Sequence, residues 1–295
     1  MHRNINEFGG DNERVTIFGE SAGGGSVDAL VLAPPDPLPF SAAIMESGQA
    51  TIFLSQHDSL DSWKKLTNLT GCNKDSLECI RKIPATQLKD VIEHNQLKFG
   101  PIHDGITWTT NPRNDRLQSK PNKSKIARVP ILIGSNRDEA TVFTQGQSHQ
   151  KQVGFTEMAF QCPAAVVAED SEQVGIPSWR YFYNATFANM DIFPGAGVYH
   201  SSEIPLIFGT YPKNGASQFQ KATSDMMQKA WADFAKNPTQ GPGWAQVPQL
   251  AIIEGEDDNA ADQTAVKPKV EKPDSVDKNC GQYKLLYGIV GVLTK

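Results

Sequence analysis

The sequence of 295 residues lacks several features that would each define a class of protein. Its longest candidate for a membrane span, residues 285–293, is too short and contains glycines. No apolar stretch follows a basic start, so we expect no signal peptide. Lysine and arginine number 28 against 33 aspartate and glutamate, for a net charge of -5. This balance provides no broad positive surface, so we do not expect nucleic acid as a partner.

Metal motifs and repeats are also missing. No group of histidine, cysteine and acidic residues has the spacing of a metal site, and we expect no cofactor. The four cysteines form an even number, which fits two disulfides but fits free buried thiols as well. A hydrophobic share of 39% and a charged share of 21% suit a single large α/β domain over residues 1–295.

A short motif near the amino end carries the strongest chemical signal. Residues 19–23 read Gly-Glu-Ser-Ala-Gly and follow a β-branched run at residues 15–18. In the G-x-S-x-G pattern, a serine lies on a tight turn from a strand to a helix, and its glycines avoid clashes. Ser21 is therefore a candidate nucleophile, and the amide of Ala22 is a candidate oxyanion donor. An ordinary glycine-rich turn is the alternative interpretation.

A serine nucleophile needs a base, and the base needs an acid that orients it. The expected chain order is serine, acid, histidine. Glu139 and Asp138 compete for the acid, because both follow the buried-strand pattern of residues 130–134. Composition alone does not choose the base among the six histidines, which are His2, His57, His94, His103, His149 and His200.

Apolar patterns predict an alternation of strands and helices. We expect strands at residues 15–18, 43–46, 130–134 and 179–183, and helices at residues 60–69, 86–94 and 218–236. Asn237 and Pro238 should end the last of these helices. We expect residues 254–278, which are acidic and then rich in lysine and proline, to form an exposed loop.

Around these motifs the sequence resembles the type-B carboxylesterase and cholinesterase family, and its fungal secreted members most of all. The resemblance runs nearly position for position through residues 8–24 and continues at residues 43–48, 100–105, 129–140, 195–200 and 203–209. It implies an incomplete α/β-hydrolase fold, namely the carboxyl-terminal half of a doubly wound sheet. In such a half sheet the nucleophile strand becomes an uncovered edge.

The resemblance also assigns roles to individual residues. It implies Ser21 as nucleophile, Glu139 as acid and His200 as base, with Glu20 close to the histidine. Ser47 matches a buried family serine that hydrogen-bonds within the triad network, although a purely structural serine is the alternative. The family's other oxyanion amides come from a glycine-rich loop that we do not find in this sequence. Ala22 is then the one remaining donor, and losing one donor typically costs about 10²- to 10³-fold in rate.

Further expectations concern cysteines and surface sites. The resemblance implies disulfides Cys72–Cys79 and Cys162–Cys280. Three sequons, at Asn68, Asn122 and Asn184, would accept glycans in a secreted chain. Secretion is typical of the family, whereas the expected lack of a signal peptide argues against it.

The family has a long helical region between the acid and the segment around Cys162. Here only a polar bridge, residues 144–152, joins the two. This shortening could shift Glu139 relative to His200.

These features predict a carboxylic ester hydrolase that acts on a small-molecule ester through an acyl-enzyme. The alternative is a catalytically inactive cholinesterase-like fragment or binding protein. A third possibility is complementation by a separately encoded amino-terminal half.

Overall fold

The computed structural model describes residues 3–50, 57–72, 76–102, 104–256 and 264–284. The chain divides into two compact units. We call Phe53–Trp108 the helical unit, and Met1–Ile52 together with Thr109–Lys295 the sheet unit. The nucleophile, acid and base that the resemblance implies, Ser21, Glu139 and His200, all belong to the sheet unit.

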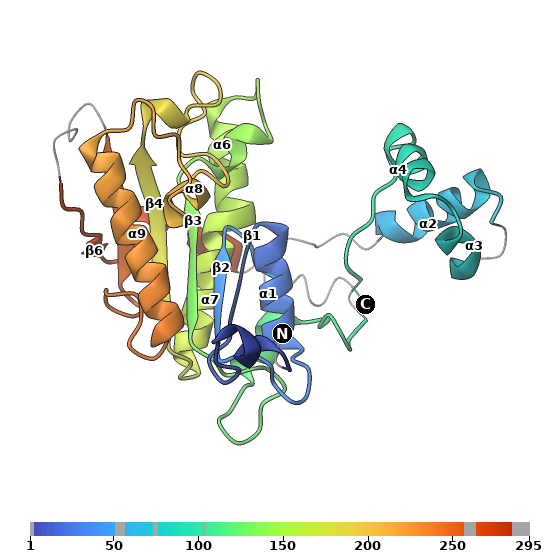
Figure 1. The fold of residues 1–295 in the computed structure, drawn as a ribbon, viewed down its shortest axis with the longest axis horizontal. Coiled ribbons are helices and arrows are strands. Elements are labelled where there is room, and N and C mark those ends of the chain that lie inside the picture. Colours follow the sequence, from blue (N-terminus) through green and yellow to red (C-terminus); the bar gives the residue numbers. More distant parts are fainter. Residues whose placement is uncertain (1–2, 51–56, 73–75, 103, 257–263, 285–295) are drawn as a thin grey trace. The chain divides into compact units, whose positions relative to one another are not determined.

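A six-stranded sheet forms the centre of the sheet unit (Figure 1). Its strands follow one another in chain order from β1 to β6. The first five are parallel, and β6 is antiparallel to β5. Their bounds are β1 Thr16–Glu20, β2 Ala42–Glu46, β3 Ile131–Asn136, β4 Ser178–Thr186, β5 Leu250–Glu256 and β6 Lys269–Glu271.

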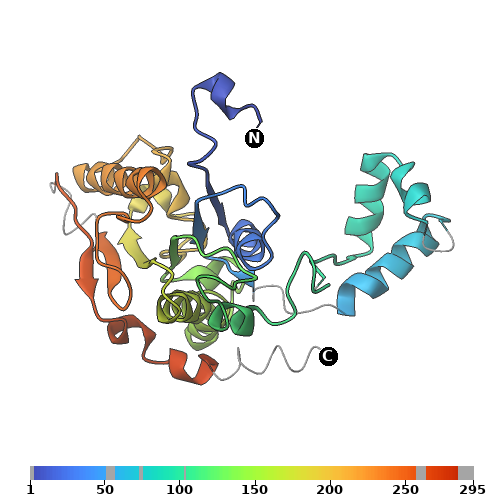
Figure 2. The ribbon, with the colours of Figure 1, turned by 90° about the horizontal axis from the view of Figure 1, so that it is seen from below.

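Helices cover both faces of this sheet (Figure 2). Along β2, Ala43 and Met45 pack on the side of α1 and α7, whereas Ile44 packs on the side of α8 and α9. Parallel strands that are buried on both faces consist of nearly continuous apolar runs, and β2 is such a strand. The helices are α1 Ala22–Leu32, α5 Pro112–Leu117, α7 Cys162–Gln173, α8 Ile204–Ile207 and α9 Gln218–Lys236.

The four predicted strands are present, but β1, β3 and β4 run further toward their carboxyl ends than predicted. The predicted loop at residues 254–278 is wrong in part. It contains the end of β5, all of β6 and the short helix α11, Asp274–Asp277. Pairing with Leu250–Ile252 on β5 makes residues 269–271 a strand, although two of the three, Lys269 and Glu271, are charged residue types that are depleted in strands.

The segment after the acid is largely helical, but within the shortened bridge, residues 144–152, helical structure begins only at His149. The segments are η3 Glu139–Val142, α6 His149–Thr156 and a π-helical stretch η4 Glu157–Gln161, which runs directly into α7. A disulfide links Cys162 at the start of α7 to Cys280. Two further short 3₁₀ helices are η1 Ile5–Phe8 and η5 Ala188–Met190.

The helical unit contains α2 His57–Leu69, α3 Leu77–Arg81 and α4 Ala85–His94. Its small core includes Leu66 and Ile80, and the disulfide Cys72–Cys79 lies beside them. The apolar stripe predicted for α2 is only partly buried, since Leu60 and Leu69 are more than half exposed. None of the described helices combines the length and the apolar character that crossing a bilayer requires.

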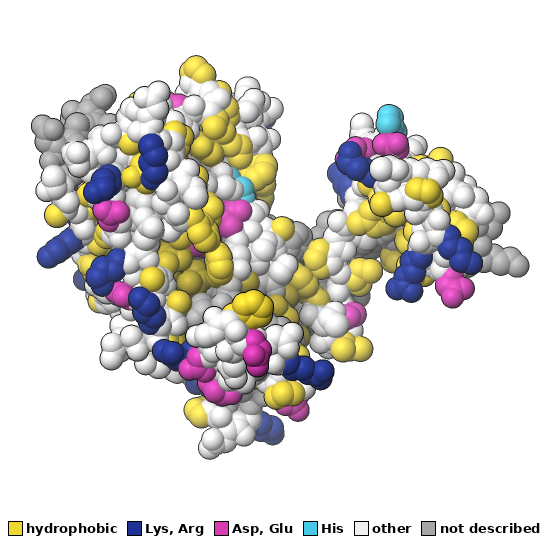
Figure 3. Space-filling view, viewed as in Figure 1, with side chains coloured by type: hydrophobic (Ala, Val, Ile, Leu, Met, Phe, Trp, Pro, Cys, Tyr) yellow, Lys and Arg dark blue, Asp and Glu magenta, His cyan; other side chains and the backbone are white. Residues whose placement is uncertain are grey.

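Strand β1 lies at the edge of the sheet, as the resemblance implied. Within the described segments it pairs with β2 and with no other strand. A groove of about 360 Å³ lies beside it, lined mainly by apolar side chains that include Ile44, Phe208 and Trp231. Hydrophobic side chains are visible on this face of the sheet unit (Figure 3). Phe18 of β1 is itself 50% exposed.

Candidate active site

The turn between β1 and α1 holds Ser21 in a strained backbone conformation. Its φ of 57° and ψ of -118° lie outside the regions that a residue with a side chain usually adopts. The Ser21 amide donates to the carbonyl of Glu46 at 2.8 Å, and its carbonyl accepts from Gly25 at 3.0 Å. These bonds tie the turn to the end of β2 and to the first turn of α1.

The glycines around the turn are not equivalent. A Cβ at Gly19 would lie 2.5 Å from the Gly23 carbonyl carbon, and a Cβ at Gly48 only 1.9 Å from the Ser21 carbonyl oxygen. A Cβ at Gly23 would meet nothing within 4 Å. The expectation that both motif glycines avoid clashes is therefore correct for Gly19 and wrong for Gly23.

Glu139 and His200 form a buried hydrogen bond. Glu139 follows β3 at the start of η3 and is fully buried. One of its oxygens, Oε1, accepts from the backbone amide of Asn136 at 2.7 Å. The other, Oε2, lies 2.6 Å from Nδ1 of His200, on the loop that precedes α8. The short bridge after Glu139 therefore has not separated it from His200.

The ring of His200 packs against two aromatic side chains. Its centroid lies 5.0 Å from that of Phe143 and 4.9 Å from that of Phe160. Burial lowers the pKa of His200, but the hydrogen bond and charge of Glu139 and the charge of Glu20 outweigh it. The net result is a raised pKa. With Nδ1 donating to Glu139, Nε2 is the nitrogen left for proton transfer.

Glu20 lies on the Nε2 side of the same ring. Its Oε1 is 3.0 Å from Nε2 and accepts a hydrogen bond from Ser201 Oγ at 2.7 Å. Burial raises the pKa of Glu20, and the charge of Glu139 adds to this. The charge of His200 and the bond from Ser201 act in the opposite direction.

The structure brings Glu20, Glu139 and His200 together, with Ser21 adjacent to Glu20 in the chain. Nε2 of His200 is buried and has no hydrogen-bond partner in the described part of the chain, so no bond joins it to Ser21. Ala22 is exposed at the start of α1, where backbone amides lack helical acceptors.

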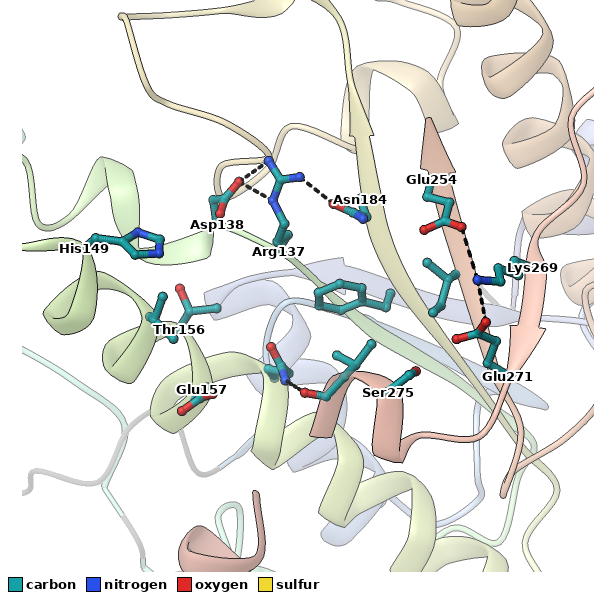
Figure 4. Close-up of a pocket in the computed structure, with 15 residues that line it drawn as sticks. Arg137, Asp138, His149, Thr156, Glu157, Asn184, Glu254, Lys269, Glu271 and Ser275 are labelled. Carbon is teal, nitrogen blue, oxygen red and sulfur yellow. Dashed lines mark hydrogen bonds and ion pairs between the residues drawn. The ribbon is translucent and has the colours of Figure 1, made fainter. Parts of the chain in front are cut away.

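Asp138, the alternative acid, has a different environment. Its carboxylate accepts from the amide of Val198 at 2.8 Å and pairs with Arg137 at 2.7 Å. Figure 4 shows Arg137 between Asp138 and Asn184. Asp138 thus connects the turn of Glu139 to the loop of His200 without touching the imidazole ring.

Ser47 does not join the network that the resemblance implied. It is fully buried with a φ of 46°, and its amide donates to the Gly134 carbonyl at 3.0 Å. Its hydroxyl has no hydrogen-bond partner among the described residues. The structure therefore shows Ser47 as part of the backbone turn after β2.

Sequence reasoning missed two buried acids below the site. Glu46 is fully buried and accepts from Trp231 Nε1. Burial raises its pKa to about 7, the nearby charge of Glu20 contributes, and the Trp231 bond opposes. Glu203 is also fully buried, accepts from Asn136 Nδ2 and has a strongly raised pKa, mainly through burial. An acidic residue ending the apolar run of β2 was the available signal for Glu46.

The other candidates lie at varied positions. Asn68 on α2 and Asn122 in a loop are exposed, whereas Asn184 is half-buried in β4 and its Oδ1 accepts from Arg137 at 2.7 Å. His94 and His149 lie on α4 and α6, while His2 and His103 fall outside the described residues. Within the described segments, no group of histidine, cysteine and acidic side chains could hold a metal ion.

Comparison with known proteins gives consistent matches. The model of the carboxylesterase family matches residues 1–154 and 147–269. Secreted lipase 5 of Gibberella zeae is 30% identical over 276 residues, which cover 83% of this chain and 51% of the lipase. Chlorogenic acid esterase of Aspergillus niger is 30% identical over 253 residues, 81% of this chain and 48% of the esterase. The chain thus spans about half the length of the curated relatives it matches.

Among solved structures, a PNB esterase superposes with a TM-score of 0.75 at 23% sequence identity. The match covers 96% of this chain and 66% of the esterase, and shows a shared α/β-hydrolase fold. The family model and the two fungal relatives each match most of the sequence. The residues matched by the family model include the segments around Ser21, Glu139 and His200. The chain belongs to the carboxylesterase family.

Proposed function

We propose that the chain carries the nucleophile, base and acid of a carboxylic ester hydrolase. Ser21 Oγ attacks the carbonyl carbon of an ester, and His200 Nε2 takes the hydroxyl proton. His200 then gives that proton to the departing alcohol, leaving an acyl group on Ser21. The same histidine activates a water molecule that releases the acid and regenerates the serine.

The buried contact between Glu139 and His200 is the observation that carries this proposal. A carboxylate 2.6 Å from Nδ1 keeps the proton on that nitrogen and stabilises the imidazolium that forms when Nε2 accepts a proton. The strained turn at Ser21 supports the same role, because backbone strain persists mainly where function requires it.

An inactive cholinesterase-like fragment or binding protein is the second candidate. The observation that favours it is the oxyanion site, where Ala22 supplies the one candidate amide that we identify among the described residues. Each missing donor typically costs about 10²- to 10³-fold in rate. An oxyanion site with a single donor would support only slow turnover even with nucleophile, base and acid in position.

The substrate class and the location are proposed from the names of the relatives, the net charge and the disulfides. The names of two of them specify a secreted lipase and a chlorogenic acid esterase. We propose a neutral or cationic small-molecule ester, because a net charge of -5 disfavours polyanions. An extracellular location is supported by the two disulfides, which persist in oxidising compartments.

A fluorophosphonate probe tests the proposal. The 295-residue chain is incubated with the probe, and the modified peptide is located by mass spectrometry. We expect labelling at Ser21 that disappears in Ser21→Ala and persists in Ser26→Ala, a matched change of an exposed serine on α1. No labelling of a chain that circular dichroism shows to be folded would instead favour the inactive fragment.

A further inference from the structure

Ser201, the residue after the candidate base, has an unusual backbone conformation. Its φ of 71° lies in the left-handed region that favours glycine. A residue with a side chain persists there when the surrounding structure compensates for the strain. Its hydroxyl makes one such contact, donating to Glu20 Oε1 at 2.7 Å.

The oxygen that accepts from Ser201 also borders the reacting nitrogen. Oε1 of Glu20 lies 3.0 Å from Nε2 of His200, yet the two atoms lack the geometry of a hydrogen bond. Glu139 meanwhile occupies Nδ1. The His200 ring is thus held by a hydrogen bond at Nδ1, while Nε2 faces the Glu20 carboxylate without a hydrogen bond to it.

This arrangement creates a conflict for a general base. Nε2 needs a free lone pair to accept the proton of Ser21, but an anionic oxygen 3.0 Å away favours a proton that stays between the two groups. A donor hydroxyl on that oxygen disperses part of its negative charge and fixes its direction.

Building on the proposed function, we propose that Ser201 is a positioning residue that acts through Glu20. Its hydroxyl holds Oε1 and weakens the retention of a proton between Glu20 and His200, which keeps Nε2 open to Ser21. Ser201 itself transfers no proton and forms no bond with the substrate.

The charges around the pair make such a donor useful. The charge of Glu139 on η3 raises the pKa of both Glu20 and His200. The charge of Glu20 in turn raises the pKa of Glu46 at the end of β2, and the charges of Glu139 and Glu46 raise the pKa of Glu203 before α8. Burial, the charges of Glu203, Glu46 and Glu139, and last the charge of Glu20 raise the pKa of Tyr181 on β4. An ionised Glu139 therefore strengthens proton retention at the pair, whereas the Ser201 bond lowers the pKa of Glu20.

Three substitutions separate the hydroxyl from the backbone strain. Ser201→Ala removes the hydroxyl but keeps the Cβ at positive φ. Ser201→Gly also removes the hydroxyl and relieves the strain, so it should retain the fold. Ser201→Thr keeps the hydroxyl and serves as the conservative rescue.

The first readout is an NMR titration of the imidazole nitrogens in ¹⁵N-histidine-labelled full-length chain, with the His200 signals assigned through His200→Gln. We expect the apparent pKa of the Glu20–His200 pair to rise in both Ser201→Ala and Ser201→Gly, and to remain unchanged in Ser201→Thr. An unchanged titration in the alanine and glycine variants would overturn the proposal. So would a change in the alanine variant alone, because that result would assign the effect to strain.

The second readout is the rate of fluorophosphonate labelling at Ser21 against pH. At pH 6, where proton retention matters, we expect labelling of Ser201→Ala to be about three- to tenfold slower than wild type, the effect of one hydrogen bond of ordinary strength. At pH 9 the rates should be equal. Uniform slowing at all pH values would indicate a merely structural role and refute the inference. If the wild-type chain is not labelled at any pH, the proposed function fails, while the titration still decides the role of Ser201.

Discussion

Glu46 should make the stability of this protein decrease as pH rises. Burial raises the pKa of Glu46 from its ordinary 4.5 to about 7. Between these values the folded protein keeps the proton, whereas the unfolded chain releases it. The stabilisation is therefore complete below about pH 4.5 and is lost as pH rises through about 7.

The size of the effect follows from that difference in pKa. One pH unit corresponds to roughly 1.4 kcal/mol, so the interval from 4.5 to about 7 amounts to about 3 kcal/mol. No discount for solvent applies, because the side chain is fully buried. Glu46→Gln removes the titration and keeps an acceptor for Trp231 Nε1. The free energy of unfolding of the variant relative to wild type should then rise by about 3 kcal/mol between pH 4 and pH 8.

Urea unfolding followed by circular dichroism at several pH values measures this change. A constant cost of placing an amide at position 46 cancels, because the readout is the change with pH. Glu254→Gln is the matched control, since it removes a carboxylate from an exposed position on β5. Parallel pH profiles of wild type and Glu46→Gln would refute the reasoning.

Three further predictions concern packing and modification. Gly19→Ala should lower the free energy of unfolding by about 1 to 3 kcal/mol, because the new Cβ clashes with the backbone at Gly23. Gly23→Ala meets no such clash and should stabilise α1 by up to about 1 kcal/mol. Urea unfolding midpoints measure both changes. Arg116→Ala should lower the free energy of unfolding by about 3 to 5 kcal/mol in the same assay, because it leaves the buried carboxylate of Asp28 without its ion-pair partner. In a secreting host, peptide mapping should find glycan at exposed Asn122 and none at Asn184, and a glycan at Asn184 would contradict its half-buried hydrogen bond to Arg137.

Local patterns were sufficient for the elements that bury one continuous face. The helix α9 has the predicted bounds, Gln218–Lys236, because its apolar stripe is long and polar residues and a proline follow it. Strand β5 was missed, since four apolar residues at its start do not distinguish a strand from a loop. Its ladder depends on β4, which is distant in the sequence.

The candidate site shows a similar division. Motif and resemblance singled out Ser21, Glu139 and His200, whose segments have recognisable local patterns. The contact of Ser201 with Glu20 was not predictable, because it depends on a positive φ that no glycine announces. The structure does not show the expected hydrogen bond of the Ser47 hydroxyl for a related reason, since the sequence gives the residue type but not the direction of its side chain.

The edge position of β1 also has a consequence for motion. Amide hydrogen exchange reports local opening, and edge strands open at lower free energy than central ones because fewer hydrogen bonds hold them. Ser21 directly follows β1, and in the described part of the sheet β1 has a hydrogen-bonded neighbour, β2, on one side only. Exchange protection should therefore increase from β1 through β2 to β3. The candidate nucleophile is then carried by a strand that frays early, so its alignment depends on whatever strand or surface covers that edge.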